Sequence, residues 1–145
     1  MSNDNVTIAK IEELEGFSPR NGTNEEDGLT MWYNKIRQKR LIDLTDGDIA
    51  KAIRQEIFLT YTVSEAIKRL RVNPAIGALY DGEVMNALSA VRVEFWISNP
   101  LRFEVKSLIE SIRSGNLFSD DYQWTFEDDE QNFYKDLSKL EVQLK

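Results

Sequence analysis

The sequence contains no histidine and no cysteine among its 145 residues. Without cysteine there is no disulfide framework, no thiolate nucleophile and no thiolate metal ligand. Without histidine there is no imidazole base for a catalytic triad and no usual zinc ligand set. Catalysis would depend on carboxylates, lysine, tyrosine or a bound hard cation, and no spacing singles out such a group. We expect a protein that is not an enzyme, with no catalytic residue, cofactor or metal site.

Long hydrophobic runs are also missing, and no stretch approaches the length of a membrane-spanning helix. The first residues carry acidic side chains where an export signal needs basic ones. We therefore expect a soluble cytoplasmic protein with no membrane partner. With 41% hydrophobic residues, the chain has the size of one domain with one core, which we expect to span residues 1–145.

The net charge of −7 is unevenly distributed. Residues 1–30 and 116–145 are both strongly acidic, whereas residues 31–75 carry nine basic and five acidic side chains. A chain with this balance is repelled by phosphate backbones and attracted to basic proteins. We expect no direct nucleic-acid partner, and we interpret the basic run Lys35–Arg40 as the last turn of a helix.

Apolar residues recur every three or four positions through most of the chain, which is the spacing of one helix face. Thr45 is predicted to cap a helix that continues to Ile57, and Asp81 a helix that continues past Phe95. The stripes together predict an all-α fold, a compact single-domain bundle of about six to seven helices, in the stretches 5–15, 29–40, 45–59, 62–73, 81–98, 100–114 and 133–144. A short strand around Tyr122 to Phe126 is the one exception considered.

The stretch 71–91, RVNPAIGALYDGEVMNALSAV, combines turn formers with apolar residues. Prolines and glycines allow the chain to reverse, and we expect the apolar side chains to fold back onto the flanking helices. The two carboxylates, Asp81 and Glu83, are interpreted as structural. The turn formers are Pro74, Gly77 and Gly82, and the expected anchors are Ile76, Leu79 and Tyr80.

The sequence from about 32 to 101 resembles the immunity proteins of contact-dependent growth inhibition (CDI) systems. The resemblance includes a helix that opens with Leu-Thr and an acidic residue, an Ile-x-Gln-x-Ile segment, a second helix ending in Asn-Pro, and an aromatic residue before a third helix. The positions that carry it are Leu44, Thr45, Asp48, Ile53, Gln55, Ile57, Leu59, Tyr61, Ala66, Leu70, Asn73, Pro74, Gly77, Tyr80, Gly82, Leu88, Phe95 and Trp96.

The resemblance implies a cytoplasmic protein that binds and neutralises the C-terminal toxin domain of an exported CDI effector. We expect this cognate toxin domain to be a nuclease acting on RNA or DNA. The alternative is a helical adaptor or regulatory subunit that binds another basic protein on a shared scaffold.

An acidic aromatic segment at about 116–130 is the candidate contact surface. Its carboxylates are suited to positions that phosphates take in a basic cleft, and an aromatic ring to the position of a base. The competing interpretation is a helix start with acids favoured by the macrodipole and aromatics in the core. The candidate toxin-binding residues are Asp120, Asp121, Tyr122, Trp124, Glu127, Asp128, Asp129 and Glu130.

Overall fold

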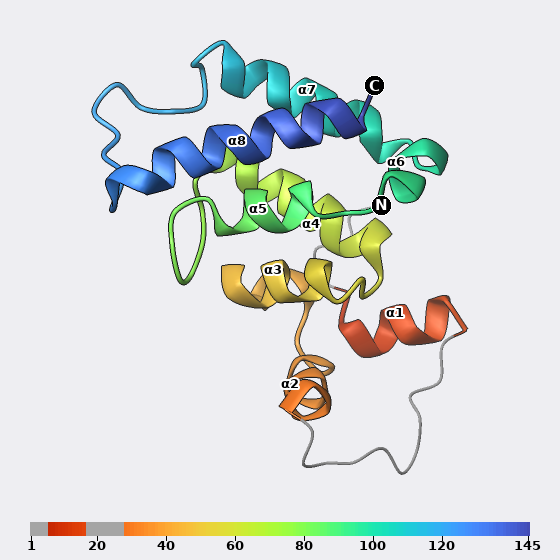
Figure 1. The fold of residues 1–145 in the computed structure, drawn as a ribbon. Helices are drawn as coiled ribbons and strands as arrows, with labels where there is room; N and C mark the ends of the chain where they lie inside the picture. The colour runs from red at the N-terminus through yellow and green to blue at the C-terminus, as the bar shows by residue number, and fades with distance from the viewer. Residues whose placement is uncertain (1–5, 17–27) are drawn as a thin grey trace. The chain divides into compact units, whose positions relative to one another are not determined.

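The computed structural model of the protein describes residues 6–16 and 28–145 (Figure 1). These residues form helices joined by turns and contain no strand, which confirms the all-α prediction. Most of the stretch 18–28, SPRNGTNEEDG, which its polar composition predicts to be a loop, lies outside the described residues. The chain divides into two compact units, residues 1–44 and 45–145. A single domain over 1–145 stays a prediction.

The first unit contains α1 (Ile8–Leu14), α2 (Gly28–Ile36) and the short 3-10 helix η1 (Leu41–Asp43). Thr7 caps α1 by accepting a hydrogen bond from the Lys10 amide at 3.0 Å. Gly16 follows the helix in a left-handed conformation, with φ +68°, which is the usual place for a glycine at a helix end. Both ends of α1 therefore follow from local sequence signals.

The helix α2 ends at Ile36, so most of the basic run Lys35–Arg40 lies beyond it. The prediction that this run forms the last turn of a helix is therefore wrong. The backbone of the run instead pairs with the first residues of α1 and with Thr7 just before that helix. The amide of Ala9 donates to the Arg37 carbonyl at 2.9 Å, and an antiparallel bridge joins Thr7 to Arg40. Because this pairing joins distant parts of the sequence, apolar periodicity gave no sign of it.

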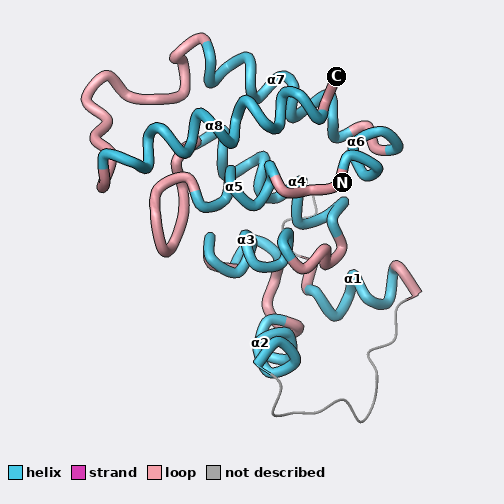
Figure 2. The backbone as a smooth tube through the Cα atoms, in the orientation of Figure 1, coloured by secondary structure: helices cyan, strands magenta, loops and turns pink. Residues whose placement is uncertain are grey.

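The second unit contains six helices, and Figure 2 shows how little loop separates most of them. In Figure 1, α8 lies over α5 and α5 over α3, and these pairs make direct contact, as α4 does with α3 and α7. The fully buried side chains include Ile49, Leu70, Leu88, Trp96 and Leu108. The helices are α3 (Asp46–Arg54), α4 (Leu59–Val72), α5 (Glu83–Ser89), α6 (Val93–Ser98), α7 (Leu101–Arg113) and α8 (Glu127–Gln143).

The capping box predicted at Thr45 is confirmed. Its hydroxyl accepts from the Asp48 amide at 3.0 Å, and the Asp48 carboxylate accepts from the Thr45 amide at 3.4 Å. The helix ends earlier than predicted, at Arg54, because Glu56 and Phe58 adopt left-handed conformations with φ +57° and +44°. Nonglycine residues rarely adopt this conformation, so no local sequence pattern signals the break.

Two predictions about the helix expected from Asp81 past Phe95 are wrong. Asp81 does not cap α5, because Gly82 occupies the N-cap position with φ +89°. The long helix predicted through Phe95 is divided into α5 and α6 by a turn at 90–92. Val91 remains buried within that turn, so the apolar stripe continues across a break that periodicity cannot detect.

The segment between α7 and α8, residues 114–126, contains none of the strand considered near Tyr122. Gly115 ends α7 with φ +81°, as expected for a helix terminator. In Figure 1 this segment and the turn between α4 and α5 lie at the same end of the second unit. That end holds the candidate surface.

Candidate interaction surface

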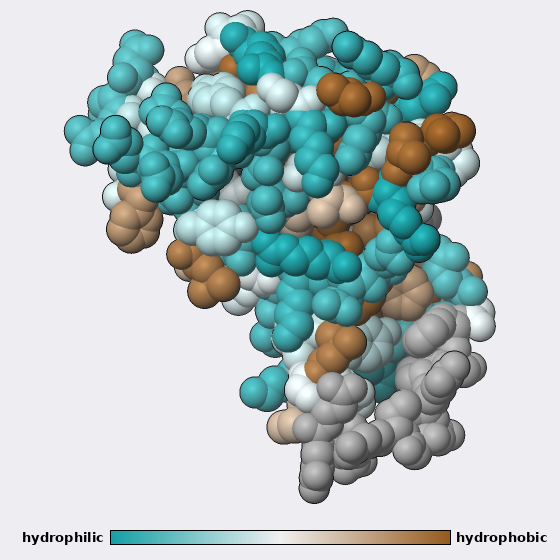
Figure 3. Space-filling view, in the orientation of Figure 1, coloured by the Kyte–Doolittle hydropathy of each residue, from teal (hydrophilic) through white to brown (hydrophobic). Residues whose placement is uncertain are grey.

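Five of the eight candidate residues lie exposed around the connection between α7 and α8, and we call them the acidic surface. Asp120 and Asp121 belong to the connection, whereas Glu127, Asp128 and Glu130 stand in the first turn of α8. The macrodipole favours carboxylates at a helix start. Figure 3 shows hydrophilic side chains gathered over this end of α8. The acidic surface presents five negative charges to solvent.

The two aromatic candidates pack inward. The rings of Tyr122 and Trp124 form an aromatic cluster with Phe118 and Phe133, and neighbouring ring centroids lie 5.1 to 5.7 Å apart. Phe133 comes from α8 and is fully buried, so the cluster fixes the connection to that helix. Both candidates are half-buried, and the exposed aromatic of the segment is Phe126, at 63%.

Asp129 differs from its acidic neighbours because it is buried, with 8% of its surface exposed. Its Oδ2 atom accepts no hydrogen bond from any residue that the structure describes. A buried carboxylate oxygen without a donor costs free energy in the isolated protein. Sequence alone predicted an exposed contact residue here, and the structure instead places an unmet acceptor beside the acidic surface.

Asp81 joins the acidic aromatic segment to the turn between α4 and α5. Its Oδ2 accepts from the Thr125 amide at 2.8 Å across 44 residues of sequence. Burial of the hydroxyl, together with the charge of Asp81 and a hydrogen bond to it, raises the pKa of Tyr122 to about 12. Asp81 is therefore the tie between two segments, a role that the sequence did not reveal.

We call the turn itself, residues 73–82, the α4–α5 corner. Two of the side chains predicted to anchor it, Leu79 and Tyr80, are exposed, so that prediction is wrong for them. Pro74 and Ala75 are buried, but Leu79 is 81% exposed and Tyr80 is also exposed. Glu83 is structural, as interpreted, and is 2% exposed. Glu83 Oε1 accepts from the amides of Ala78 and Leu79 at 2.8 and 3.2 Å. A buried carboxylate thus fixes the backbone of a protruding leucine.

A polar network extends from the α4–α5 corner to α3 and α8. The Arg54 guanidinium approaches Glu83 Oε2 at 3.7 Å and donates to the Tyr80 hydroxyl at 3.3 Å. The Tyr80 hydroxyl donates to Asn86 Oδ1 at 3.2 Å, and Asn86 donates to Asp136 Oδ2 at 3.1 Å. The network holds the corner against two helices.

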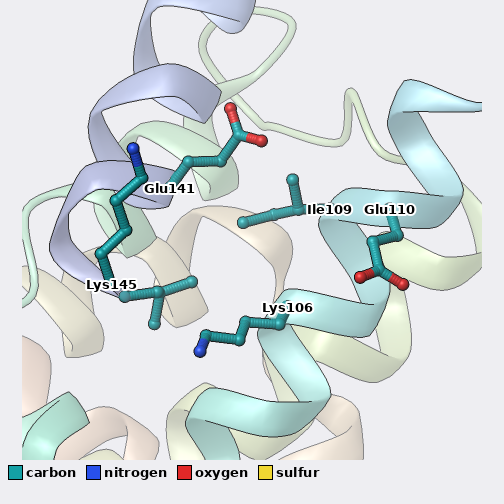
Figure 4. Close-up of a pocket in the computed structure, with 6 residues that line it drawn as sticks. Lys106, Ile109, Glu110, Glu141 and Lys145 are labelled. Atoms are coloured by element: carbon teal, nitrogen blue, oxygen red, sulfur yellow. The ribbon is translucent and has the colours of Figure 1, made fainter.

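A small open pocket of about 210 Å³ lies between α7 and the end of α8 (Figure 4). In the close-up, Lys106 and Ile109 extend from α7 toward the end of α8, where Glu141 and Lys145 stand. The described residues contain no group of three or more side chains suited to a metal ion. None of the helices in residues 6–16 and 28–145 is long and apolar enough to cross a bilayer.

These features define an all-α protein with an exposed acidic surface at one end of α8. Residues 13–105 match the family of CDI immunity proteins, and the chain belongs to this family. It is therefore an immunity protein that binds a CDI toxin. The match contains the stretch 32–101 that carries the resemblance and ends before the acidic aromatic segment. Comparison with curated proteins gave no match.

Proposed function

We propose that the protein neutralises a basic nuclease toxin in the cytoplasm by binding it through the acidic surface. The observation that carries this proposal is the set of five exposed carboxylates, two on a connection held to α8 by the aromatic cluster and three in the first turn of α8. A nuclease needs a cationic cleft for its polyanionic substrate, and fixed carboxylates complement such a cleft. Inhibition then requires occupancy alone and no catalysis by the immunity protein.

The first test is co-expression with the C-terminal toxin domain of the CDI effector encoded immediately upstream. Growth rescue and co-purification of a stable complex support neutralisation by binding. The purified toxin domain should degrade RNA or DNA, and an equimolar amount of this protein should stop that degradation. A toxin domain that kills but leaves both nucleic acids intact overturns the nuclease assignment and leaves neutralisation in place. Recovery of the protein outside the cytosolic fraction overturns the cytoplasmic location.

The second test concerns the acidic surface. The double variant Glu127→Gln/Asp128→Asn removes two exposed negative charges from α8. Its matched control, Glu94→Gln/Glu110→Gln, removes two exposed charges from α6 and α7. We expect the first variant to lower the association rate about tenfold at low salt, with a smaller deficit as ionic strength rises. Equal rates for the two variants would place the contact elsewhere.

Trp124 is less suited to this test than its position in the segment suggests. Its ring contacts three other members of the aromatic cluster. Trp124→Ala would therefore displace the connection as well as remove a contact, and a loss of affinity would have two causes. The exposed carboxylates avoid this ambiguity because they stand outside the cluster.

A further inference from the structure

Leu79 is 81% exposed although hydrogen bonds hold the backbone that carries it. An apolar side chain in water contributes nothing to the core. Yet Glu83 is withdrawn from solvent to bind the Ala78 and Leu79 amides. Folding therefore holds a protruding leucine in one position.

Close backbone packing fixes the α4–α5 corner further. A Cβ atom at Gly77 would lie 2.1 Å from the Tyr80 carbonyl oxygen, so only glycine fits. The Gly82 amide donates to the Ala75 carbonyl at 2.8 Å, and the Val84 amide to the Ile76 carbonyl at 3.2 Å. A loop already ordered in the free protein loses little conformational entropy when a partner covers it, which increases the affinity available from one apolar contact.

The α4–α5 corner and the acidic surface belong to one face. Asp81, two residues after Leu79, accepts a hydrogen bond from Thr125, and Thr125 lies between the two parts of the acidic surface. Phe133 lies 3.4 Å from the position of a Cβ atom built on Gly82, so α8 packs directly on the corner. The corner and the start of α8 also lie at one end in Figure 1.

We propose that the α4–α5 corner is the apolar half of the toxin contact, with Leu79 as its anchor and the acidic surface as its charged half. The occupant is the basic toxin domain, at a nonpolar recess bordered by lysine or arginine side chains. An apolar centre with a complementary charged border is the usual arrangement of a protein interface. This inference rests on the proposed function, because it names the structure of the same contact.

Asp129 adds a buried negative charge to the same end of α8. It stands between Asp128 and Glu130 of the acidic surface, and its Oδ2 atom accepts no hydrogen bond from the described residues. Its negative charge also acts on the Tyr122 hydroxyl. A cationic side chain that a partner brings to the acidic surface would be attracted by this charge as well.

The test compares Leu79→Ala with Ile97→Ala in binding to the upstream toxin domain. Both substitutions remove three carbon atoms from an exposed side chain, at 81% and 65% exposure. Ile97 is on α6, far from the corner in Figure 1. Because both are exposed, the full-length variants should unfold at the same urea concentration as the parent protein. We expect Leu79→Ala to raise Kd about tenfold or more, and Ile97→Ala less than twofold.

Salt dependence separates the two halves of the contact. The loss caused by Leu79→Ala should persist at high ionic strength, whereas the loss caused by Glu127→Gln/Asp128→Asn should shrink. An unchanged Kd for Leu79→Ala, with tight binding by the parent protein, overturns the corner contact and leaves the proposed function intact. Equal losses for Leu79→Ala and Ile97→Ala also overturn it. Failure of the parent protein to bind the toxin domain overturns both proposals together.

Discussion

Arg37 and Glu12 form a bidentate ion pair inside the first unit. The Arg37 Nη2 atom lies 2.6 Å from Glu12 Oε1, and its Nε atom lies 2.8 Å from Oε2. The Tyr33 hydroxyl donates a further hydrogen bond to Oε2. Glu12 is 3% exposed, so its charge depends on these donors. This pair joins α1 to the chain just after α2.

Arg37→Met should therefore lower the free energy of unfolding of the first unit by about 3 kcal/mol. The substitution keeps an apolar stem but leaves a buried carboxylate without its cation. Urea unfolding at neutral pH measures the loss. The control is Lys10→Ala, because Lys10 pairs with Glu13 at 3.5 Å in an exposed position, where about 0.5 kcal/mol is expected. Comparable losses of unfolding free energy for the two variants would show that the buried Arg37–Glu12 pair stabilises the fold no more than an exposed pair.

The same pair predicts acid sensitivity. Burial alone would raise the pKa of Glu12, but hydrogen bonds from Arg37 and Tyr33 and the charge of Arg37 outweigh it, so the pKa lies below its ordinary value of 4.5. A carboxyl with a lowered pKa stabilises the fold above that ordinary value, and this contribution disappears as the pH falls through the folded-state pKa. Glu12→Gln should thus be less stable than the parent protein at neutral pH, with a gap that narrows on acidification. A gap that is constant with pH would contradict the assignment.

The α4–α5 corner should not tolerate Gly77→Ala. The added Cβ would meet the Tyr80 carbonyl at 2.1 Å and the Glu83 Cβ at 2.7 Å, so the backbone that carries Leu79 must move. We expect a loss of about 2 kcal/mol in unfolding free energy, typical of overpacking. Gly28→Ala is the control, because nothing lies within 4 Å of its added Cβ. If Gly77→Ala were as stable as Gly28→Ala, the backbone of the corner would move aside at little cost in free energy, contrary to what its close contacts indicate.

The Tyr122 hydroxyl should ionise at a higher pH than an ordinary tyrosine. Burial, followed by the charge of Asp81 and a hydrogen bond to it, raises its pKa to about 12. A raised pKa means that the neutral hydroxyl is favoured in the folded state, so its stabilising contribution is present below the ordinary value of 10.0 and is lost as the pH rises toward 12. The difference in tyrosinate absorbance between the parent protein and Tyr122→Phe isolates this titration. In Asp81→Asn the same difference should appear at lower pH; an unchanged midpoint would argue against the link through Asp81.

Local signals in the sequence determined most of the helices. The capping box at Thr45 and the glycines that end α1 and α7 act within a few residues, and the apolar stripes reflect burial of one helix face. The family resemblance from 32 to 101 was also visible in sequence, because it rests on capping and turn motifs at fixed spacing. The eight candidate residues share charge or an aromatic ring, and these properties do not determine whether a side chain is exposed or buried.

Only the tertiary structure decided which of these side chains are exposed and which are buried. Trp124 packs inward because α8 supplies Phe133, around which the aromatic cluster forms, and Asp129 is buried while its acidic neighbours are exposed. Leu79 is exposed in a loop whose amides donate to the buried Glu83 carboxylate. The link between Asp81 and Thr125 spans 44 residues and leaves no trace in local patterns. Helix positions follow from interactions within a few residues, but the exposure of a loop side chain depends on long-range contacts that only the assembled chain provides.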